Sequence, residues 1–125
     1  MGSKETLYNW GRALKSRDVK NILSLYSNNA ILLGTFATTI KQGHKEIGSY
    51  FDGLVKKQNL NVQFNETLKQ PFNNITIYSG NYTFMWTDNF VGLDKKVLAR
   101  FTFGIAKEKN VWKIVQHHSS LQNKW

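Results

Sequence analysis

The amino-acid sequence predicts an α+β domain whose helices gather on one face of a bent antiparallel sheet. Two observations lead to this prediction. In the first half of the 125-residue chain, apolar residues recur at helical spacing. In the second half, apolar and polar residues alternate through long segments, as they do in half-buried strands. At this length we expect a single domain, residues 1–125.

The helical half is predicted to contain three helices and one short strand. The first helix covers residues 4–15, with Ser3 as its N-cap and an apolar face of Leu7, Trp10, Ala13 and Leu14. Asp18 opens the second helix, whose apolar face consists of Val19, Ile22, Leu23 and Tyr26. Residues 27–29 are typical of a turn, and 30–33 of a buried strand. A third helix is expected after residues 41–44, with Ile47, Phe51, Leu54 and Val55 on its apolar face, and should end near residues 58–59.

Four strands are predicted after the helices, at residues 62–70, 75–91, 97–107 and 111–119. Pro71 falls between the first two. Side chains alternate between the two faces of a strand, so Arg100 shares a face with Leu98 and Thr102. The opposite face carries Phe101, Phe103 and Ile105. In the last strand, the same alternation groups Trp112, Ile114, Gln116 and His118.

The amino-acid composition argues against several classes of binding partner. The net charge is +9, but the lysines are scattered and there are only three arginines, so we expect no nucleic-acid partner. The chain has no cysteine, and its three histidines have no ligand-like spacing, so neither a metal nor another cofactor is expected. No apolar stretch could span a bilayer, and no signal sequence is visible. We therefore expect a cytoplasmic protein without a membrane partner.

Arg100, His117, His118 and Asp88 are the residues most able to carry chemistry. Arg100 lies between apolar neighbours, so it is either a pocket arginine that meets an anion or an exposed arginine on the outer face. One histidine of the adjacent pair is expected to face a pocket beside Arg100, or to be a satisfied core residue. Asp88 shares a face with Phe84 and Trp86 and is either a base of raised pKa or a solvated turn residue.

Six segments together resemble one protein family, with the pattern from Arg100 to Ser120 as the most specific part. These segments are residues 10–14, 22–26, 29–35, 43–51, 99–103 and 112–120. They are similar to bacterial relatives of the association (hub) domain of calcium/calmodulin-dependent protein kinase type II, which belong to the nuclear transport factor 2-like, SnoaL-like superfamily. The resemblance covers about residues 4–121.

The resemblance implies a cone: a strongly curved antiparallel sheet that wraps around a long helix, with a pocket at the open end. It also implies homodimers, or higher oligomers, formed through the outer sheet face, where we expect Phe101, Phe103 and Ile105 to make an apolar patch. No kinase domain fits in the chain, so no kinase activity is expected.

By position in the resemblance, Arg100 corresponds to a pocket arginine of the hub, and His118 to its terminal-strand histidine. The other hub arginine has no counterpart in residues 83–87, which favours a small carboxylate or aromatic acid as ligand. Arg100 would pair with the anion, His118 would donate a hydrogen bond, and the apolar walls would be Trp86, Phe84, Tyr50 and Trp10.

Two further hypotheses remain open. The superfamily includes isomerases, cyclases and dehydratases, so the same pocket could act on a small cyclic substrate, with His118 or Asp88 as the catalytic base. A scaffold that associates with itself and binds no ligand is the third. The sequence does not decide whether the protein is an enzyme.

Overall fold

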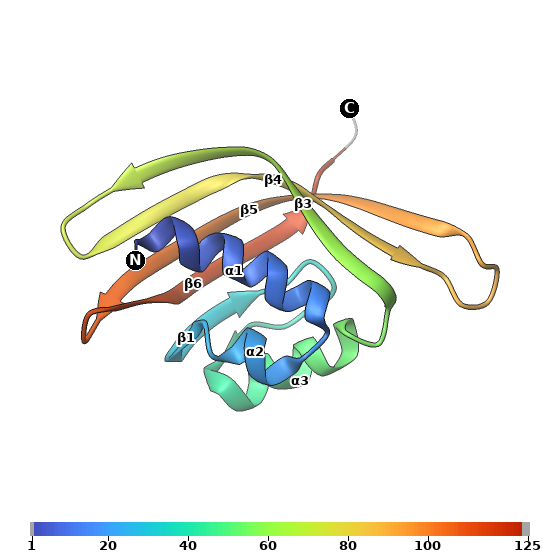
Figure 1. Cartoon of the computed structure of the whole chain (residues 1–125), viewed down its shortest axis with the longest axis horizontal. Helices are drawn as coiled ribbons and strands as arrows, with labels where there is room; N and C mark the ends of the chain where they lie inside the picture. Colours follow the sequence, from blue (N-terminus) through green and yellow to red (C-terminus); the bar gives the residue numbers. More distant parts are fainter. Residues whose placement is uncertain (1, 124–125) are drawn as a thin grey trace.

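The computed structural model describes residues 2–123, which form three helices and six strands (Figure 1). In chain order the elements are α1 (Ser3–Ser16), α2 (Val19–Leu23), β1 (Tyr26–Leu33), β2 (Lys41–Gln42), α3 (Gly43–Leu54), β3 (Gln58–Pro71), β4 (Ile75–Thr87), β5 (Asp94–Glu108) and β6 (Val111–Leu121). The strands make one curved sheet in the order β2-β1-β6-β5-β4-β3. The predicted α+β fold class is confirmed.

One strand pair departs from the expected antiparallel pattern. β3 to β6 form antiparallel hairpins, but β1 runs parallel to β6, with Leu32 opposite His117. A parallel pair needs a long connection, and here most of the chain lies between the two strands. This pairing brings the loop after β1 beside the C-terminal end of β6, where the candidate sites lie.

The predicted helices exist, with different ends. Gly2 is the N-cap of α1, while Ser3 is its first helical residue and its hydroxyl bonds the Tyr78 hydroxyl at 2.8 Å. The Asp18 carboxylate accepts the Lys20 N–H at 3.0 Å and caps α2, as predicted. α2 is short, because Tyr26 and the expected turn at residues 27–29 belong to β1. α3 ends at Leu54, earlier than predicted.

The core lies between the helices and one face of the sheet, called the inner face here. Trp10 of α1 stacks on Tyr82 of β4, with ring centroids 5.7 Å apart. Phe101, Phe103 and Ile105 of β5 are at most 4% exposed on this face. The expected apolar patch at these three residues is therefore wrong. A sheet covered on one side turns its apolar set toward the helices, and Arg100 and Thr102 consequently point to the exposed outer face.

Among the residues that the structure describes, none of the helices has the length and apolarity needed to cross a membrane.

Candidate functional site: an outer pocket and an inner cavity

An extra residue in β6 decides which histidine enters the core. Gly104 pairs with Gln116, but Ile105 pairs with Ile114, so Val115 bulges out of the ladder. The bulge shifts the alternation, and Ile114 and His117 both point inward, while His118 is exposed. Uninterrupted alternation had grouped Ile114 with His118, and that grouping is wrong.

His117 is the centre of a buried chain of hydrogen bonds. Its Nδ1 lies 2.8 Å from the Tyr26 hydroxyl, and its Nε2 lies 3.1 Å from the Tyr82 hydroxyl. The Tyr82 hydroxyl donates its proton to Ser119 Oγ at 2.6 Å, and Ser119 also bonds Thr35. Since Tyr82 gives away its proton, its oxygen accepts from Nε2–H of His117, and Nδ1 accepts from Tyr26. The chain of bonds thus fixes one neutral tautomer of His117.

Burial keeps every titratable member of this chain neutral. Desolvation lowers the pKa of His117 to about 3, and the neighbouring His118 lowers it further in the same direction. Desolvation also raises the pKa of Tyr26 and of Tyr82 well above the usual tyrosine value. Phe103 stacks on the His117 ring with centroids 3.8 Å apart, and Trp10 meets the same ring edge-on with centroids 5.1 Å apart.

A small space of about 10 Å³, called the inner cavity here, lies next to His117, Tyr82 and Ser119. Three of the four predicted apolar walls, Trp10, Tyr50 and Phe84, line it together with His117 and Ser119. Trp10 is 1% exposed, and its Nε1 has no hydrogen-bond partner among residues 2–123. Its indole N–H lies close enough to the Tyr26 hydroxyl to oppose the rise of that pKa, without reaching hydrogen-bond geometry.

The fourth predicted wall, Trp86, lies just outside the inner cavity. Phe36, from the loop after β1, packs edge-on against Phe84 and Trp86, with ring centroids 5.3 and 5.9 Å away. The Phe36 N–H donates to the Tyr50 hydroxyl at 3.4 Å, and burial raises the pKa of Tyr50 to about 12. We call these four residues, Phe36, Tyr50, Phe84 and Trp86, the aromatic mouth. Sequence reasoning missed Phe36.

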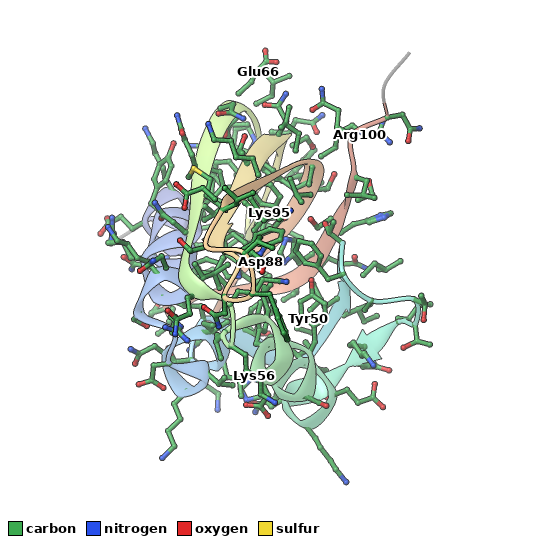
Figure 2. The ribbon with its side chains drawn as sticks, turned by 90° about the vertical axis from the view of Figure 1, so that its right-hand side faces the viewer. Tyr50, Lys56, Glu66, Asp88, Lys95 and Arg100 are labelled. Atoms are coloured by element: carbon green, nitrogen blue, oxygen red, sulfur yellow. The ribbon has the colours of Figure 1, made fainter. Side chains whose placement is uncertain are left out.

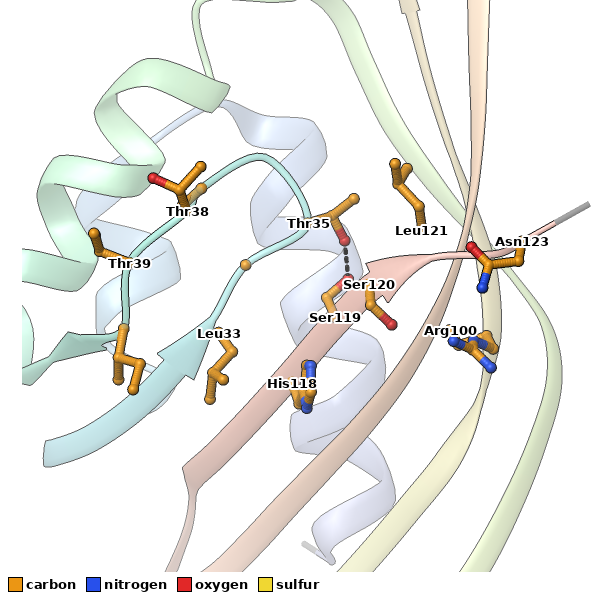
Figure 3. A pocket seen from close by; sticks show the side chains of 13 residues that line it. Leu33, Thr35, Thr38, Thr39, Arg100, His118, Ser119, Ser120, Leu121 and Asn123 are labelled. Carbon is orange, nitrogen blue, oxygen red and sulfur yellow. Dashed lines mark hydrogen bonds between the residues drawn. The ribbon is translucent and has the colours of Figure 1, made fainter.

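Arg100 and His118 come together on the outer face, away from the aromatic mouth. Arg100 lies opposite Ser120 and His118 opposite Thr102, so the two are diagonal neighbours on β5 and β6 (Figure 3). They line a depression of about 480 Å³ between these strands and residues 33–40, called the outer pocket here. None of the described residues that line it is acidic.

The sheet therefore divides the predicted site into two. Arg100 and His118 are together, as predicted, but the apolar walls lie on the other side of the sheet (Figure 2 shows Arg100 far from Tyr50). Gly34 and Ser119 line both spaces, and the bond between Thr35 and Ser119 closes the boundary between them (Figure 3). Expecting one pocket was wrong because the strand alternation was assigned to the wrong faces.

Asp88 lies in the turn between β4 and β5. Its Oδ1 accepts the N–H groups of Phe90 and Val91, at 2.8 and 3.3 Å. The carboxylate therefore stabilises the turn, and it lines neither the inner cavity nor the outer pocket. Of the two alternatives from the sequence, the turn residue matches this geometry.

The buried residues Tyr26, Tyr82 and Ser119 and the half-buried Thr35 were not predicted as site residues. Tyrosines in an alternating strand are typical of any core, so the sequence carries no signal that they converge on one histidine. Within residues 2–123, no three histidine or carboxylate side chains lie close enough together to hold a metal ion.

Comparison with known proteins gives the same picture of the fold. A protein from Xanthomonas campestris, provisionally assigned as a calcium/calmodulin-dependent protein kinase II association domain, is 27% identical with a TM-score of 0.90, over 98% of this chain and 87% of its own. A provisionally assigned aromatic ring hydroxylase from Novosphingobium aromaticivorans is 13% identical, with a TM-score of 0.84 over 97% of this chain and 87% of its own.

A provisionally assigned dehydratase of the NTF2-like family from Streptomyces avermitilis is 12% identical, with a TM-score of 0.82 over 97% of this chain and 94% of its own. At such identities the last two show the fold alone. None of the curated proteins compared with the chain matches it. The family model of the SnoaL-like domain matches residues 4–123. The resemblance inferred from the sequence is confirmed, and the chain belongs to the SnoaL-like domain family.

Proposed function

We propose that this chain is a small, self-associating domain that binds a small carboxylate or an aromatic acid and has no kinase activity. The observation that carries the proposal is the outer pocket, which joins the Arg100 guanidinium to His118 and Ser120 without an acidic neighbour among its described lining. A guanidinium presents its N–H donors as a fork that fits both oxygens of a carboxylate. Arg100 pairs with the anion, and His118 donates a hydrogen bond beside it.

The volume and exposure of the outer pocket fit this role. About 480 Å³ lies within the range of small-molecule sites. Arg100 and His118 are both exposed, so a ligand reaches them without any movement of the sheet. Thr38, Thr39 and Ser120 of the lining add hydroxyl donors around the anion, while the hydroxyls of Thr35 and Ser119 bond each other.

The test is a thermal-shift screen with acetate, succinate and benzoate. At about a hundred times its dissociation constant, a bound acid adds roughly 2.7 kcal/mol of stability, which is a Tm shift of a few degrees at this size. We expect the shift in the wild type and its loss in Arg100→Gln. Arg12→Gln is the matched control, because Arg12 is an exposed arginine on α1 that bonds Asn9 outside the pocket. Equal binding of every acid by Arg100→Gln and wild type would contradict the proposal.

The self-association is proposed to use the outer face of the sheet. Leu98 is 49% exposed there, on the strand that carries Arg100. It supports the proposal in place of the three buried residues of β5 that the sequence had suggested.

A second candidate function is a SnoaL-like isomerase, cyclase or dehydratase that acts on a small cyclic substrate. The polar groups of Tyr82, His117 and Ser119 in the otherwise apolar lining of the inner cavity favour it, since a hydroxyl that exchanged its present partner for an oxyanion would stabilise that charge in a dry site. Neither candidate base, Asp88 or His118, lines the inner cavity, and the lowered pKa of His117 makes it a weak base. Binding is therefore the better supported function. Turnover of a small cyclic ketone that is lost in Tyr82→Phe would reverse this order.

A further inference from the structure

The outer pocket has an apolar end as well as a basic end. Leu33, the last residue of β1, lies opposite His118 of β6, so both side chains are on the outer face of the sheet. Ile40 also lines the pocket and is 65% exposed to solvent. The pocket therefore offers apolar contacts at some distance from the Arg100 guanidinium.

The pairing of β1 with β2 places the two apolar residues side by side. Leu32 pairs with Lys41 in antiparallel register, and the next step of this register sets Leu33 against Ile40. Residues that lie opposite each other in a sheet point to the same face, so Ile40 follows Leu33 to the outer face. Together they form the apolar end of the pocket.

The loop that carries Ile40 is tied to the sheet. The Thr35 hydroxyl bonds the Ser119 hydroxyl of β6, and the Ala37 N–H donates to the Gly34 carbonyl oxygen at 3.2 Å. These bonds hold the loop beside β6 before any ligand arrives. A ligand that contacts Ile40 therefore does not have to order the loop first.

The basic end of the pocket lies across the sheet from the apolar end. Arg100 is on β5, opposite Ser120 of β6, and β6 separates it from β1 and β2. Neighbouring strands are about 4.8 Å apart, so the Arg100 backbone is about 10 Å from β1 and about 14 Å from β2. Figure 3 shows the same order, with His118 between Arg100 and Leu33. A ligand that contacts both ends must be elongated.

The charge of the pocket is confined to one end. Arg100 and His118 are the only basic side chains among the described residues that line it, and none of the described lining is acidic. A second carboxylate placed against Leu33 and Ile40 would lose water without meeting a cation. The pocket thus matches a molecule that is charged at one end and apolar at the other.

We propose that the outer pocket binds an unbranched aliphatic monocarboxylate, whose carboxylate pairs with Arg100 and whose alkyl chain crosses β6 to Leu33 and Ile40. This inference rests on the proposed acid-binding function and names the class of acid. Acetate binds through its charge alone. A longer acid also removes apolar surface of its own chain and of Ile40 from water, so affinity rises with chain length.

The experiment is isothermal titration calorimetry of the full chain with acetate, butyrate, hexanoate and octanoate at constant ionic strength. We expect each added CH₂ to tighten binding about twofold, against about fourfold for full burial, because the pocket is open to solvent. Ile40→Ser should remove most of this increase and leave acetate binding unchanged. Leu93→Ser is the matched control, since Leu93 is 61% exposed and lies outside the pocket.

Octanedioate tests the charge pattern with the same chain length. It should bind at least about tenfold more weakly than octanoate, because its second carboxylate would lie at the apolar end. Equal binding of octanedioate and octanoate would contradict an apolar end that lacks a cation.

The outcomes separate this inference from the proposed function. If all four acids bind equally and all require Arg100, acid binding stands and the contact with the alkyl chain is wrong. If affinity rises with chain length equally in wild type and Ile40→Ser, the chain lies elsewhere and the inference is overturned. If no acid binds the wild type, both proposals fail. A shift of the Ile40 methyl resonances with octanoate, absent with acetate, would support the inference directly.

Discussion

His117 and His118 are neighbours in the chain, yet β6 sends one into the core and the other to solvent. The buried ring is held by two tyrosines and kept neutral, and the exposed ring lies beside Arg100 in the outer pocket. At the scale of single residues, the sequence named both histidines but could not tell which one the core would bury. Burial, and not residue type, separates the structural histidine His117 from His118, which solvent can reach.

The buried histidine predicts a stability that depends on pH. The unfolded chain protonates His117 below its ordinary pKa of about 6.5, but the folded protein does so only near pH 3. The unfolded state thus binds more protons between these values, and stability falls as pH falls, by about 1.4 kcal/mol per pH unit. Above about pH 6.5 the contribution is complete.

Urea unfolding at a series of pH values measures this slope. His117→Gln, which can keep hydrogen bonds but does not titrate, should lose most of the slope between about pH 6 and pH 4. His118→Gln, the exposed counterpart, should keep it. The same slope in wild type and His117→Gln would show that His117 titrates normally in the folded state.

At the scale of elements, β3 and β4 pair through a bulge that gives the sheet its bend. Glu66 pairs with Asn81 after a register shift, and a Cβ at Gly80 would lie 1.8 Å from the Glu66 carbonyl oxygen. Only a glycine permits this approach of two backbones. The alternation of apolar and polar residues predicted both strands. A bulge of one residue cannot be recognised from that alternation.

Replacing each of two glycines by alanine should change the free energy of unfolding in opposite directions. Gly80→Ala should lower the free energy of unfolding by at least about 2 kcal/mol, because backbone atoms must move apart. Gly53→Ala, in α3 with open space around it, should raise it by about 0.5–1 kcal/mol, because alanine favours the helix. Chemical denaturation of the two variants measures both effects. A neutral Gly80→Ala would mean that the strands do not approach so closely.

At the scale of the whole molecule, the decisive feature is which face of the sheet the helices cover. α1 and the apolar set of β5 bury each other, so the polar set around Arg100 forms the outer face. A stable dimer buries about 800 Å² on each partner, and the outer face is the side of the sheet that the helices leave exposed.

Self-association through this face predicts a dimer in light scattering at micromolar concentration. Leu98→Lys should shift the population to monomers, because it places a charge in the interface at a residue that is exposed in the single chain. Leu93→Lys is the control, since Leu93 is 61% exposed in the turn before β5 and outside the paired strands that form the outer face. A monomeric wild type, or equal dissociation by both variants, would contradict the proposed interface.

The sequence by itself indicated most of the elements and their order, because hydrophobic periodicity is a local property of the chain, although it did not predict β2. The family followed from the resemblance of six segments, and the SnoaL-like domain model over residues 4–123 confirms it. Strand alternation drew attention to Arg100, and the resemblance added His118 and the aromatic walls. Only the tertiary structure decided that they lie on opposite sides of the sheet, since alternation defines two faces without saying which one the helices cover. The bulge at Val115 and the position of Lys57 over Trp86 depend on contacts between distant segments, and periodicity contains no information about those.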